Sequence, residues 1–200
     1  SDLVLMRGHG DYLRLGRTRD DAVGEAFDKV ARALGLPQPG GPALEALARS
    51  GDSHAFSFGV SNLEPSFDVS YSGLKTAGAQ AVAKNQPLQP ATAAAIAASF
   101  QRAAVQQLRR NVERALASHE VKTLGLCGGV AANEALREAL RGAAEAAHID
   151  FVVPDRLLCT DNAAMIAAAG FHRFSSLPPA RRAYSVEMLD FEAHSLLPVA

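Results

Sequence analysis

The sequence is poor in cysteine and in metal-binding patterns. Its two cysteines, Cys127 and Cys159, have no CxxC partner and no metal-ligand spacing, and its six histidines form no HxxxH or HExxH pair. We therefore assign no histidine to a metal, and we expect a reduced, cytoplasmic setting. No apolar run approaches the roughly 20 residues that a membrane span needs. The start Ser1-Asp2-Leu3 is unlike a signal peptide, so we expect no membrane partner.

Charge of one sign is also lacking, since 20 lysines and arginines face 21 aspartates and glutamates, for a formal net charge of -1. This balance excludes a positive field over the whole surface, so any contact with nucleic acid must be local. The best local candidate is an amino-terminal basic group formed by Arg7, Arg14, Arg17 and Arg19. With 48% hydrophobic and 20% charged residues, the chain is able to bury a core. Because it starts without methionine, we expect a processed chain or a piece of a longer protein.

The first half of the chain predicts a hairpin, two helices and a strand. Two short apolar stretches around residues 8–11 are typical of a β-hairpin. A helix is expected from Asp20 to Leu34, then a Pro/Gly loop over residues 36–41 and a short helix that begins at Pro42. Apolar and polar residues alternate over residues 67–73, which predicts a half-buried strand.

The second half alternates helices and strands, which favours an α/β fold. A long alanine-rich helix is expected from Thr92 to Leu116, and periodicity is weak beyond Leu177. Between them we expect a strand, a helix, a strand and a helix, at residues 122–127, 130–147, 151–153 and 162–174. Because a helix separates the two closing strands, we expect them to be parallel neighbours.

A buried strand that turns through Gly128-Gly129 directly into a helix is a candidate anion site. Glycines let the backbone approach a ligand closely, and the positive end of a helix favours an anion such as phosphate. A tight turn without a ligand explains the glycines equally well, because the pattern is neither GxGxxG nor a P-loop with its lysine. Asn133, one turn into the helix, either reaches a ribose hydroxyl or caps the helix. Lys75, after the SYSG turn, is either a second anion contact or a surface lysine.

Two interpretations compete for Asp161, which stands between Thr160 and the helix expected from Asn162. The simpler one is an N-cap aspartate that stabilises the helix by about 1 kcal/mol. The other is a metal ligand at the mouth of a strand-loop-helix crevice, where α/β folds present their ligands. One carboxylate cannot hold a metal alone, and the remaining ligands are missing from the sequence pattern.

Further candidates lie in the first predicted helix and after it. Glu25 and Asp28 are three residues apart on one helix face, as an acid/base pair or a clamp for hydroxyl groups requires, although Glu25 and Lys29 also suit a surface ion pair. Gly40-Gly41 either brings the backbone against a ligand, with Glu45 in the next turn, or simply forms a loop before a helix.

Four motifs together resemble one family. In order and spacing, DDAVGEAFDKVARALGLPQPGGP, SFDVSYSGLKTA, CGGVAANEALR and CTDNAAMIAAAG resemble the universal tRNA threonylcarbamoyladenosine synthase family in its catalytic subunit, TsaD, from Ser1 to about Phe174. Each motif alone is weak, whereas four long motifs in the right order are specific. The sequence departs from the family at Gln38, usually a tyrosine, and at Gly59, usually a proline, and both departures concern loop shape.

The resemblance implies an actin-like, Hsp70-like (ASKHA) fold of two ribonuclease-H-like lobes with the nucleotide between them. Residues 1–200 would form the second lobe, with a helical insertion at about residues 36–90, and the first lobe would be absent from this chain. The family's other metal ligands, a histidine pair, lie in that first lobe. We therefore do not expect this chain to catalyse alone.

The resemblance also implies roles for single residues. Asp161 would be a metal ligand, against the N-cap interpretation, and Ser1 would be the last residue of an SGGHT or SGGHS phosphate loop. The residues that would contact the nucleotide or adenylate are Asp28, Gly41, Glu45 and Asn133. The implied cofactors are one divalent metal ion, iron or zinc, and an adenine nucleotide or threonylcarbamoyl-adenylate. No catalytic residue is assigned.

The implied activity is transfer of the threonylcarbamoyl group from threonylcarbamoyl-adenylate to the exocyclic amine of the adenosine next to the anticodon in tRNAs that read ANN codons. The implied partners are tRNA, a TsaB-like paralogue and a TsaE-like ATPase. The alternative is a non-catalytic paralogue that acts as a dimerisation scaffold, although such a paralogue is expected to lose CTDN and PGGP, which are intact here. A glycoprotein endopeptidase would need a metalloprotease motif, which is missing, and a generic ATPase would leave the tRNA modification untouched.

Overall fold

The computed structural model describes residues 1–178, which form two compact units. The first unit contains residues 1–3 and 15–160, and the second contains residues 4–14 and those that follow Thr160. Each unit is described by itself. The weak periodicity that the sequence shows beyond Leu177 falls almost entirely outside the described residues.

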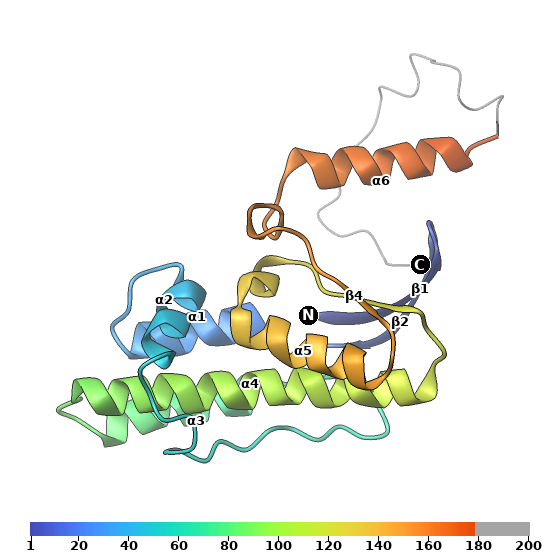
Figure 1. Ribbon diagram of the computed structural model, residues 1–200. Helices are drawn as coiled ribbons and strands as arrows, with labels where there is room; N and C mark the ends of the chain where they lie inside the picture. The colour runs from blue at the N-terminus through green and yellow to red at the C-terminus, as the bar shows by residue number, and fades with distance from the viewer. Residues whose placement is uncertain (179–200) are drawn as a thin grey trace. The chain divides into compact units, whose positions relative to one another are not determined.

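Helices dominate the first unit. They are α1 (Val23–Ala33), α2 (Gly40–Ala48), α3 (Ser72–Lys84), α4 (Pro90–Ser118) and α5 (Glu134–Ala146). Figure 1 shows α4 as the long green helix, and α4 contacts each of the other four helices. The apolar stripe predicted for α1 is confirmed, since Val23, Phe27 and Val30 are all buried. The ring of Phe27 meets that of Phe100 on α4 edge-on, with the centroids 5.3 Å apart.

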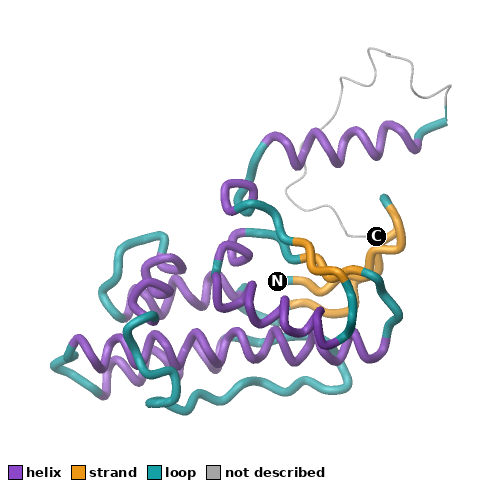
Figure 2. Tube along the Cα trace, in the orientation of Figure 1, coloured by secondary structure: helices purple, strands orange, loops and turns teal. Residues whose placement is uncertain are grey.

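Two small sheets complete the secondary structure, shown in orange in Figure 2. The strands β1 (Asp2–Gly8) and β2 (Asp11–Arg17) pair with each other, which confirms the predicted hairpin. The strands β3 (Thr123–Gly125) and β4 (Asp150–Val152) are parallel neighbours, with Leu124 opposite Phe151. The helix α5 connects them, and the α/β class predicted from the sequence is confirmed.

The strand predicted over residues 67–73 is wrong. Only Val69 pairs with the hairpin, in an isolated parallel bridge to Thr18, and α3 already begins at Ser72. The helix starts early because the Asp20 carboxylate accepts the N–H of Tyr71 at 2.8 Å and that of Ser72 at 3.2 Å. A side chain distant in the sequence therefore caps the helix and ends the extended segment.

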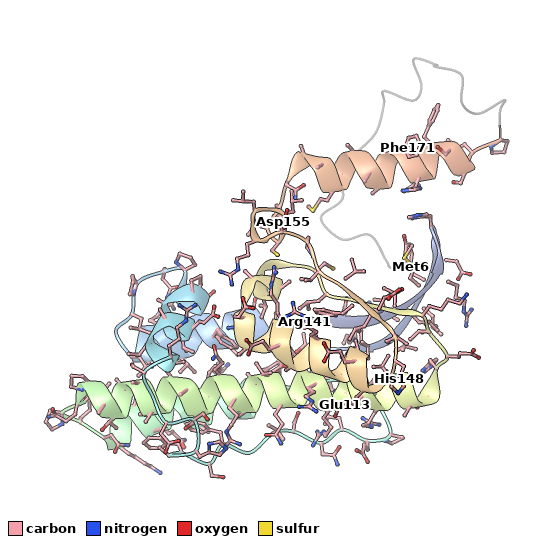
Figure 3. The ribbon with its side chains drawn as sticks, in the orientation of Figure 1. Met6, Glu113, Arg141, His148, Asp155 and Phe171 are labelled. Carbon is pink, nitrogen blue, oxygen red and sulfur yellow. The ribbon has the colours of Figure 1, made fainter. Side chains whose placement is uncertain are left out.

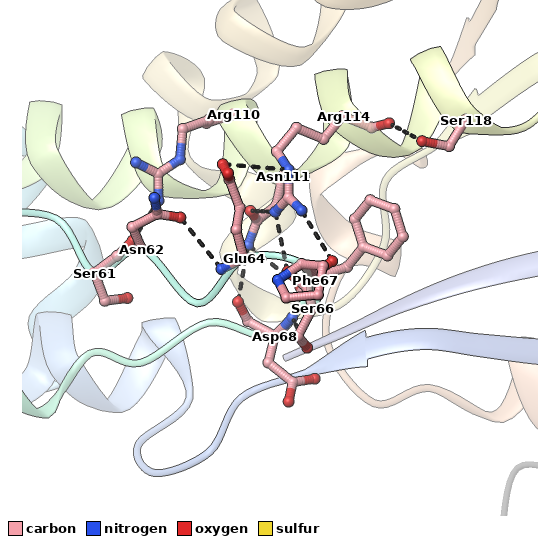
Figure 4. A network of polar contacts seen from close by, with 11 residues as sticks. Ser61, Asn62, Glu64, Ser66, Phe67, Asp68, Arg110, Asn111, Arg114 and Ser118 are labelled. Carbon is pink, nitrogen blue, oxygen red and sulfur yellow. Dashed lines mark hydrogen bonds and ion pairs between the residues drawn. The ribbon is translucent and has the colours of Figure 1, made fainter.

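The extended segment before α3 is held by side chains of α4 (Figure 4). Asn111 donates to the carbonyls of Phe67 and Asp68 at 3.2 and 3.0 Å. Arg114 donates at 3.0 Å to the carbonyl of Ser66. These bonds satisfy backbone acceptors that a sheet partner would otherwise satisfy. The segment is consequently ordered without being part of a sheet.

The helix predicted over residues 130–147 is interrupted. A short 3₁₀ turn, η1 (Gly129–Ala132), precedes α5, and Asn133 separates the two. A second 3₁₀ turn, η2 (Arg156–Leu158), follows β4. Asn133 has extended backbone angles (φ −70°, ψ 122°), as an N-cap residue requires, and this conformation divides one predicted helix into two pieces.

The second unit contains the distal part of the hairpin and α6 (Ala163–Ser176). The rings of His9 and His172 stack within it, with centroids 3.4 Å apart. Several large apolar side chains of α6 are exposed, including Ile166 and Phe171. None of the described helices is long and apolar enough to cross a membrane.

Candidate functional site

Ser1 lies at the amino end of α1. Its hydroxyl oxygen accepts the N–H of Val23, the first residue of α1, at 3.1 Å. At the same helix end, the Glu25 carboxylate accepts the N–H of Ala22 at 2.9 Å, and Lys29 pairs with Asp21. Glu25 therefore serves as a helix cap, which neither the acid/base interpretation nor the Glu25–Lys29 ion pair anticipated.

Asp28 caps the next helix. The residue before α2, Pro39, has no polar side-chain atom, and the Asp28 Oδ1 atom accepts the N–H groups of Gly40 and Gly41 at 2.9 and 3.1 Å. The helix consequently begins at Gly40 and not at the predicted Pro42. Gly40 is buried against α1. A Cβ atom at this position would lie only 2.6 Å from the Cβ of Ala31.

Glu45 and Asn133 meet at the amino end of α5. The Oε1 atom of Glu45, on α2, accepts the N–H of Glu134 at 2.9 Å. The Oδ1 atom of Asn133 accepts the N–H of Leu136 at 2.9 Å, and its Nδ2 atom donates to Gln101 of α4 at 2.9 Å. Asn133 is 7% exposed and caps α5, which confirms the capping role, while a contact with a ribose hydroxyl stays a prediction.

The loop over residues 128–133 lies between two helix ends. It leads into α5, and a Cβ atom on Gly24, in the first turn of α1, would lie 3.1 Å from the Val130 side chain. Gly128 has a φ of +90°, a conformation that side-chain-bearing residues rarely adopt. Gly128 and Gly129 are exposed, and apart from their chain neighbours no atom of residues 1–178 lies within 4 Å of the position of a Cβ at either one. A ligand is therefore able to approach the backbone here.

Four of the predicted residues thus share one structural property. Ser1, Asp28, Glu45 and Asn133 each place a side-chain oxygen on the first-turn N–H groups of a helix, α1, α2 or α5. The amino ends of helices carry partial positive charge, which favours oxygen acceptors and anions. The structure brings Asp28 to Gly41 and Glu45 to the residue after Asn133.

Lys75 faces a carboxylate. Its ammonium group lies 2.6 Å from Asp21, which also pairs with Lys29. Hydrogen bonds from the two lysines lower the pKa of the Asp21 carboxyl below its ordinary value, and Lys29 has the larger effect. The sequence position of Lys75 suggested a contact with an anion. In this structure the anion is the carboxylate of Asp21, which belongs to the same unit.

Asp161 belongs to the second unit, whereas the residues described above belong to the first. The N-cap of α6 is Asn162, whose Oδ1 atom accepts the N–H of Met165 at 3.0 Å. The N-cap interpretation of Asp161 is therefore wrong by one residue. Asp161 is exposed. Within residues 1–178 no group of three histidine, cysteine, aspartate or glutamate side chains is arranged to hold a metal ion.

The basic group of the hairpin is exposed at all four positions. Arg7 and Arg14 belong to the second unit and Arg17 to the first. Arg19 forms an ion pair with Asp68 at 2.9 Å, so its charge is partly compensated. A role in binding a phosphate backbone stays a prediction.

A groove of about 740 Å³ runs along α4, bounded by residues of α2 and α5. Its lining includes three arginines, Arg102, Arg109 and Arg110, and small residues such as Ala98 and Ala135. The residues that the sequence singled out as nucleotide contacts do not line it. We base the candidate site on the helix ends and the 128–133 loop, because their exposed backbone and capping oxygens suit a polar ligand.

Two residues that hold this region were not singled out from the sequence. Gln101 holds the amide of Asn133, and Arg137 of α5 donates to the carbonyl of Ala131 inside the 128–133 loop. Both contacts join residues that are far apart in the sequence or separated by a helix start. Only the position of Arg137 at the end of the CGGVAANEALR motif hinted at a role.

Comparison with known proteins gives one consistent result. The sequence profile of the family TsaD, described as tRNA N6-adenosine threonylcarbamoyltransferase, matches residues 1–168. A protein of that name from Symbiobacterium thermophilum is 52% identical over 172 residues, which cover 86% of this chain and 50% of the relative. One from Gloeobacter violaceus is 48% identical over 206 residues, covering all of this chain and 59% of the relative.

A third relative of the same name, from Thermomicrobium roseum, is 43% identical over 219 residues and also covers the whole chain. It too is longer, with 57% of its length matched. The chain therefore spans between about half and three fifths of the length of these relatives.

Proposed function

The chain belongs to the TsaD family of tRNA N6-adenosine threonylcarbamoyltransferases, and on that premise we propose that it is the nucleotide-binding lobe of such an enzyme. The longer protein would transfer the threonylcarbamoyl group from threonylcarbamoyl-adenylate to the exocyclic amine of the adenosine next to the anticodon in ANN-decoding tRNAs. In this transfer the amine nitrogen forms a bond to the carbamoyl carbon and loses a proton to solvent, and the bond from that carbon to the phosphate oxygen of AMP breaks, so that AMP leaves.

The proposed architecture is one ribonuclease-H-like lobe of an actin-like fold over residues 1–200, with a helical insertion at about residues 36–90. The hairpin followed by helices and the parallel pair β3–β4 support it. A first lobe would belong to the longer protein, as the matched share of the relatives suggests. A cytoplasmic location is part of the same proposal.

The observation that carries the proposal is the exposed Gly128-Gly129 backbone beside the capped ends of α1 and α5. Such an arrangement suits the phosphate of a nucleotide. Asp28 and Glu45 each use one carboxylate oxygen in a cap, Oδ1 and Oε1. Their second oxygens are suited to accept hydrogen bonds from ribose hydroxyls. Gly41 would offer its backbone to the same ligand, and Ser1 would end the phosphate loop.

A divalent metal, iron or zinc, would find one donor in this chain. The exposed carboxylate of Asp161 fits a hard cation, whereas the described residues supply no complete donor set. When bound, the metal would polarise the acyl donor or hold its phosphate. No general base is assigned to this chain.

The proposed partners are tRNA, a TsaB-like paralogue and a TsaE-like ATPase. The net charge of -1 leaves no positive field over the whole surface, so a contact with the tRNA backbone must come from a local basic group. The proposed contact is formed by the hairpin arginines Arg7, Arg14 and Arg17.

Mass spectrometry of tRNA nucleosides tests the proposed function. In cells whose full-length protein carries Asp161→Ala, we expect the threonylcarbamoylated adenosine to fall by about tenfold or more, because a metal ligand is lost. The control is Asp155→Ala, an exposed aspartate six residues earlier (Figure 3), which should leave the level unchanged. Normal levels of the modified nucleoside in the Asp161→Ala cells would refute the assignment.

A further inference from the structure

Arg137 joins two segments that flank α5 in the sequence. From the first turn of α5 its Nε atom donates to the carbonyl of Ala131, in the 128–133 loop. Its NH2 group donates to the carbonyl of Pro154 at 2.9 Å and lies 3.3 Å from the sulfur of Cys159. One guanidinium therefore contacts the loop that precedes α5 and the segment that follows β4, residues 154–159.

Two of the residues that Arg137 contacts are buried. Ala131 is completely buried and Cys159 is 3% exposed. The Cys159 thiol in turn lies 3.5 Å from the carbonyl of Asp155 and 3.8 Å from that of Pro154. Residues 154–159 also contact the start of α5 through the ion pair of Arg156 and Glu134, which is exposed on both sides. Exposed pairs contribute little to stability, so the contacts of Arg137 with buried partners are the stronger candidates for holding this segment.

The geometry of arginine matters for this connection. A guanidinium presents several N–H donors in one rigid plane, so it is able to serve two carbonyls on different segments at once. A lysine ammonium carries the same charge on a flexible stem and lacks this fixed fork. The shape of the 128–133 loop is thus coupled to an arginine and not merely to a positive charge.

We propose that Arg137 is a positioning residue, which fixes the 128–133 loop against residues 154–159 and so holds the backbone of Gly128-Gly129 in its nucleotide-binding shape. This inference rests on the proposed function for its ligand, whereas the joining of the two segments stands on the contacts alone. Asp161, the proposed metal donor, follows Cys159 by two residues in the sequence.

Thiol reactivity tests the connection directly. The chain has two free cysteines, of which Cys127 is exposed and Cys159 is buried. In the parent chain a disulfide reagent should titrate Cys127 alone, whereas in Arg137→Ala and Arg137→Lys it should titrate both thiols. The matched control is Arg141→Ala on the same helix (Figure 3), because Arg141 lies over the Phe151 ring and should leave Cys159 protected.

Thermal unfolding of every variant shows whether it is folded, and Arg137→Lys retains the test if Arg137→Ala does not fold. Cys159 that stays protected in both Arg137 variants would overturn the connection.

The affinity of the full-length protein for AMP tests the positioning role. We expect binding to be about tenfold weaker in both Arg137 variants and unchanged in Arg141→Ala, since a charge-assisted hydrogen bond to the loop is lost. Unchanged AMP affinity together with a reactive Cys159 would overturn the positioning role. A parent protein that binds no AMP would refute the proposed nucleotide site, and the positioning role with it, while the thiol result would still decide whether Arg137 joins the segments.

Discussion

Two adjacent glycines at the start of α2 should respond oppositely to alanine. A Cβ atom on Gly40 would lie 2.6 Å from the Cβ of Ala31 and 2.8 Å from the Cα of Asp28, whereas nothing lies within 4 Å of a Cβ on Gly41. Carbon atoms in contact prefer about 3.5–4.0 Å, so Gly40→Ala would force α1 and α2 apart. Neither obstructing atom is the end of a flexible side chain.

The cost of Gly40→Ala has two parts. Overpacking in a core typically costs about 1–3 kcal/mol. A shift of α2 would also weaken the bonds from the N–H groups of Gly40 and Gly41 to Asp28, and a lost cap costs about 1 kcal/mol. We therefore expect Gly40→Ala to lower the free energy of unfolding by about 2–4 kcal/mol. Gly41→Ala should raise it by up to about 1 kcal/mol, because alanine fits the helix without a clash and has the higher helix propensity.

Thermal unfolding followed by far-ultraviolet circular dichroism measures the difference. For a chain of this size the expected loss corresponds to a fall in midpoint of roughly 5–15 °C for Gly40→Ala. A midpoint for Gly40→Ala equal to that of the parent, or an equally large fall for Gly41→Ala, would refute the packing argument. Gly41→Ala, if stable, is also the clean variant in which to measure the predicted contact between Gly41 and a nucleotide.

Two further predictions concern the segment before α3. The Tyr71 hydroxyl is buried with no hydrogen-bond partner among residues 1–178. Because Tyr71→Phe removes this unpaired group, it should raise the free energy of unfolding, measured in urea, by about 1 kcal/mol. A loss of stability would show that the hydroxyl does have a partner. The N–H of Arg17 and the guanidinium of Arg19 hold the pKa of Asp68 below its ordinary value. A lowered carboxyl pKa stabilises the folded state above about pH 4, and this contribution is lost as the pH falls through the folded-state pKa. The loss of stability in acid should therefore be shallower in Asp68→Asn than in the parent, and equal slopes of urea midpoint against pH would contradict this role.

Much of the helical framework could be predicted because its signals are local. The stripe of Val23, Phe27 and Val30 has helical spacing, and all three residues are buried against other helices. The strand-helix-strand order around α5 correctly predicted that β3 and β4 are parallel. Periodicity of this kind reports which face of an element is buried, and burial is what stabilises the element.

The strand predicted over residues 67–73 shows where local signals fail. Alternation reports an extended backbone with one buried face, and Val69 and Tyr71 are indeed buried. It does not report which groups accept and donate the backbone hydrogen bonds. Here Asn111 and Arg114 supply donors from α4, and Asp20 supplies the acceptor that starts α3. Such partners are more than 40 residues away in the sequence, as the 43 to 51 residue separations show.

Helix starts failed for the same reason. The sequence placed the start of α2 at Pro42 and the cap of α6 at Asp161, and each error is one or two residues. At α2 the cap comes from Asp28, which belongs to another helix. At α6 two neighbouring residues were both suitable, and only the extended backbone of Asn162 (φ −151°, ψ 155°) decides between them. The family resemblance alone singled out Ser1, whereas Asp28, Glu45 and Asn133 were also candidates from the sequence pattern. The capping role that these four residues share became apparent only in the structure.

The capping of helix starts by these side chains bears on how a nucleotide would lie in the proposed site. The ends of α2 and α5 already hold the negative carboxylates of Asp28 and Glu45, which repel a phosphate but accept hydrogen bonds from neutral hydroxyls. The exposed Gly128-Gly129 backbone carries no side-chain charge of its own. A nucleotide would consequently point its phosphate toward the glycines and its ribose toward the carboxylates. In the proposed site the caps would therefore orient the ligand as well as stabilise the helices.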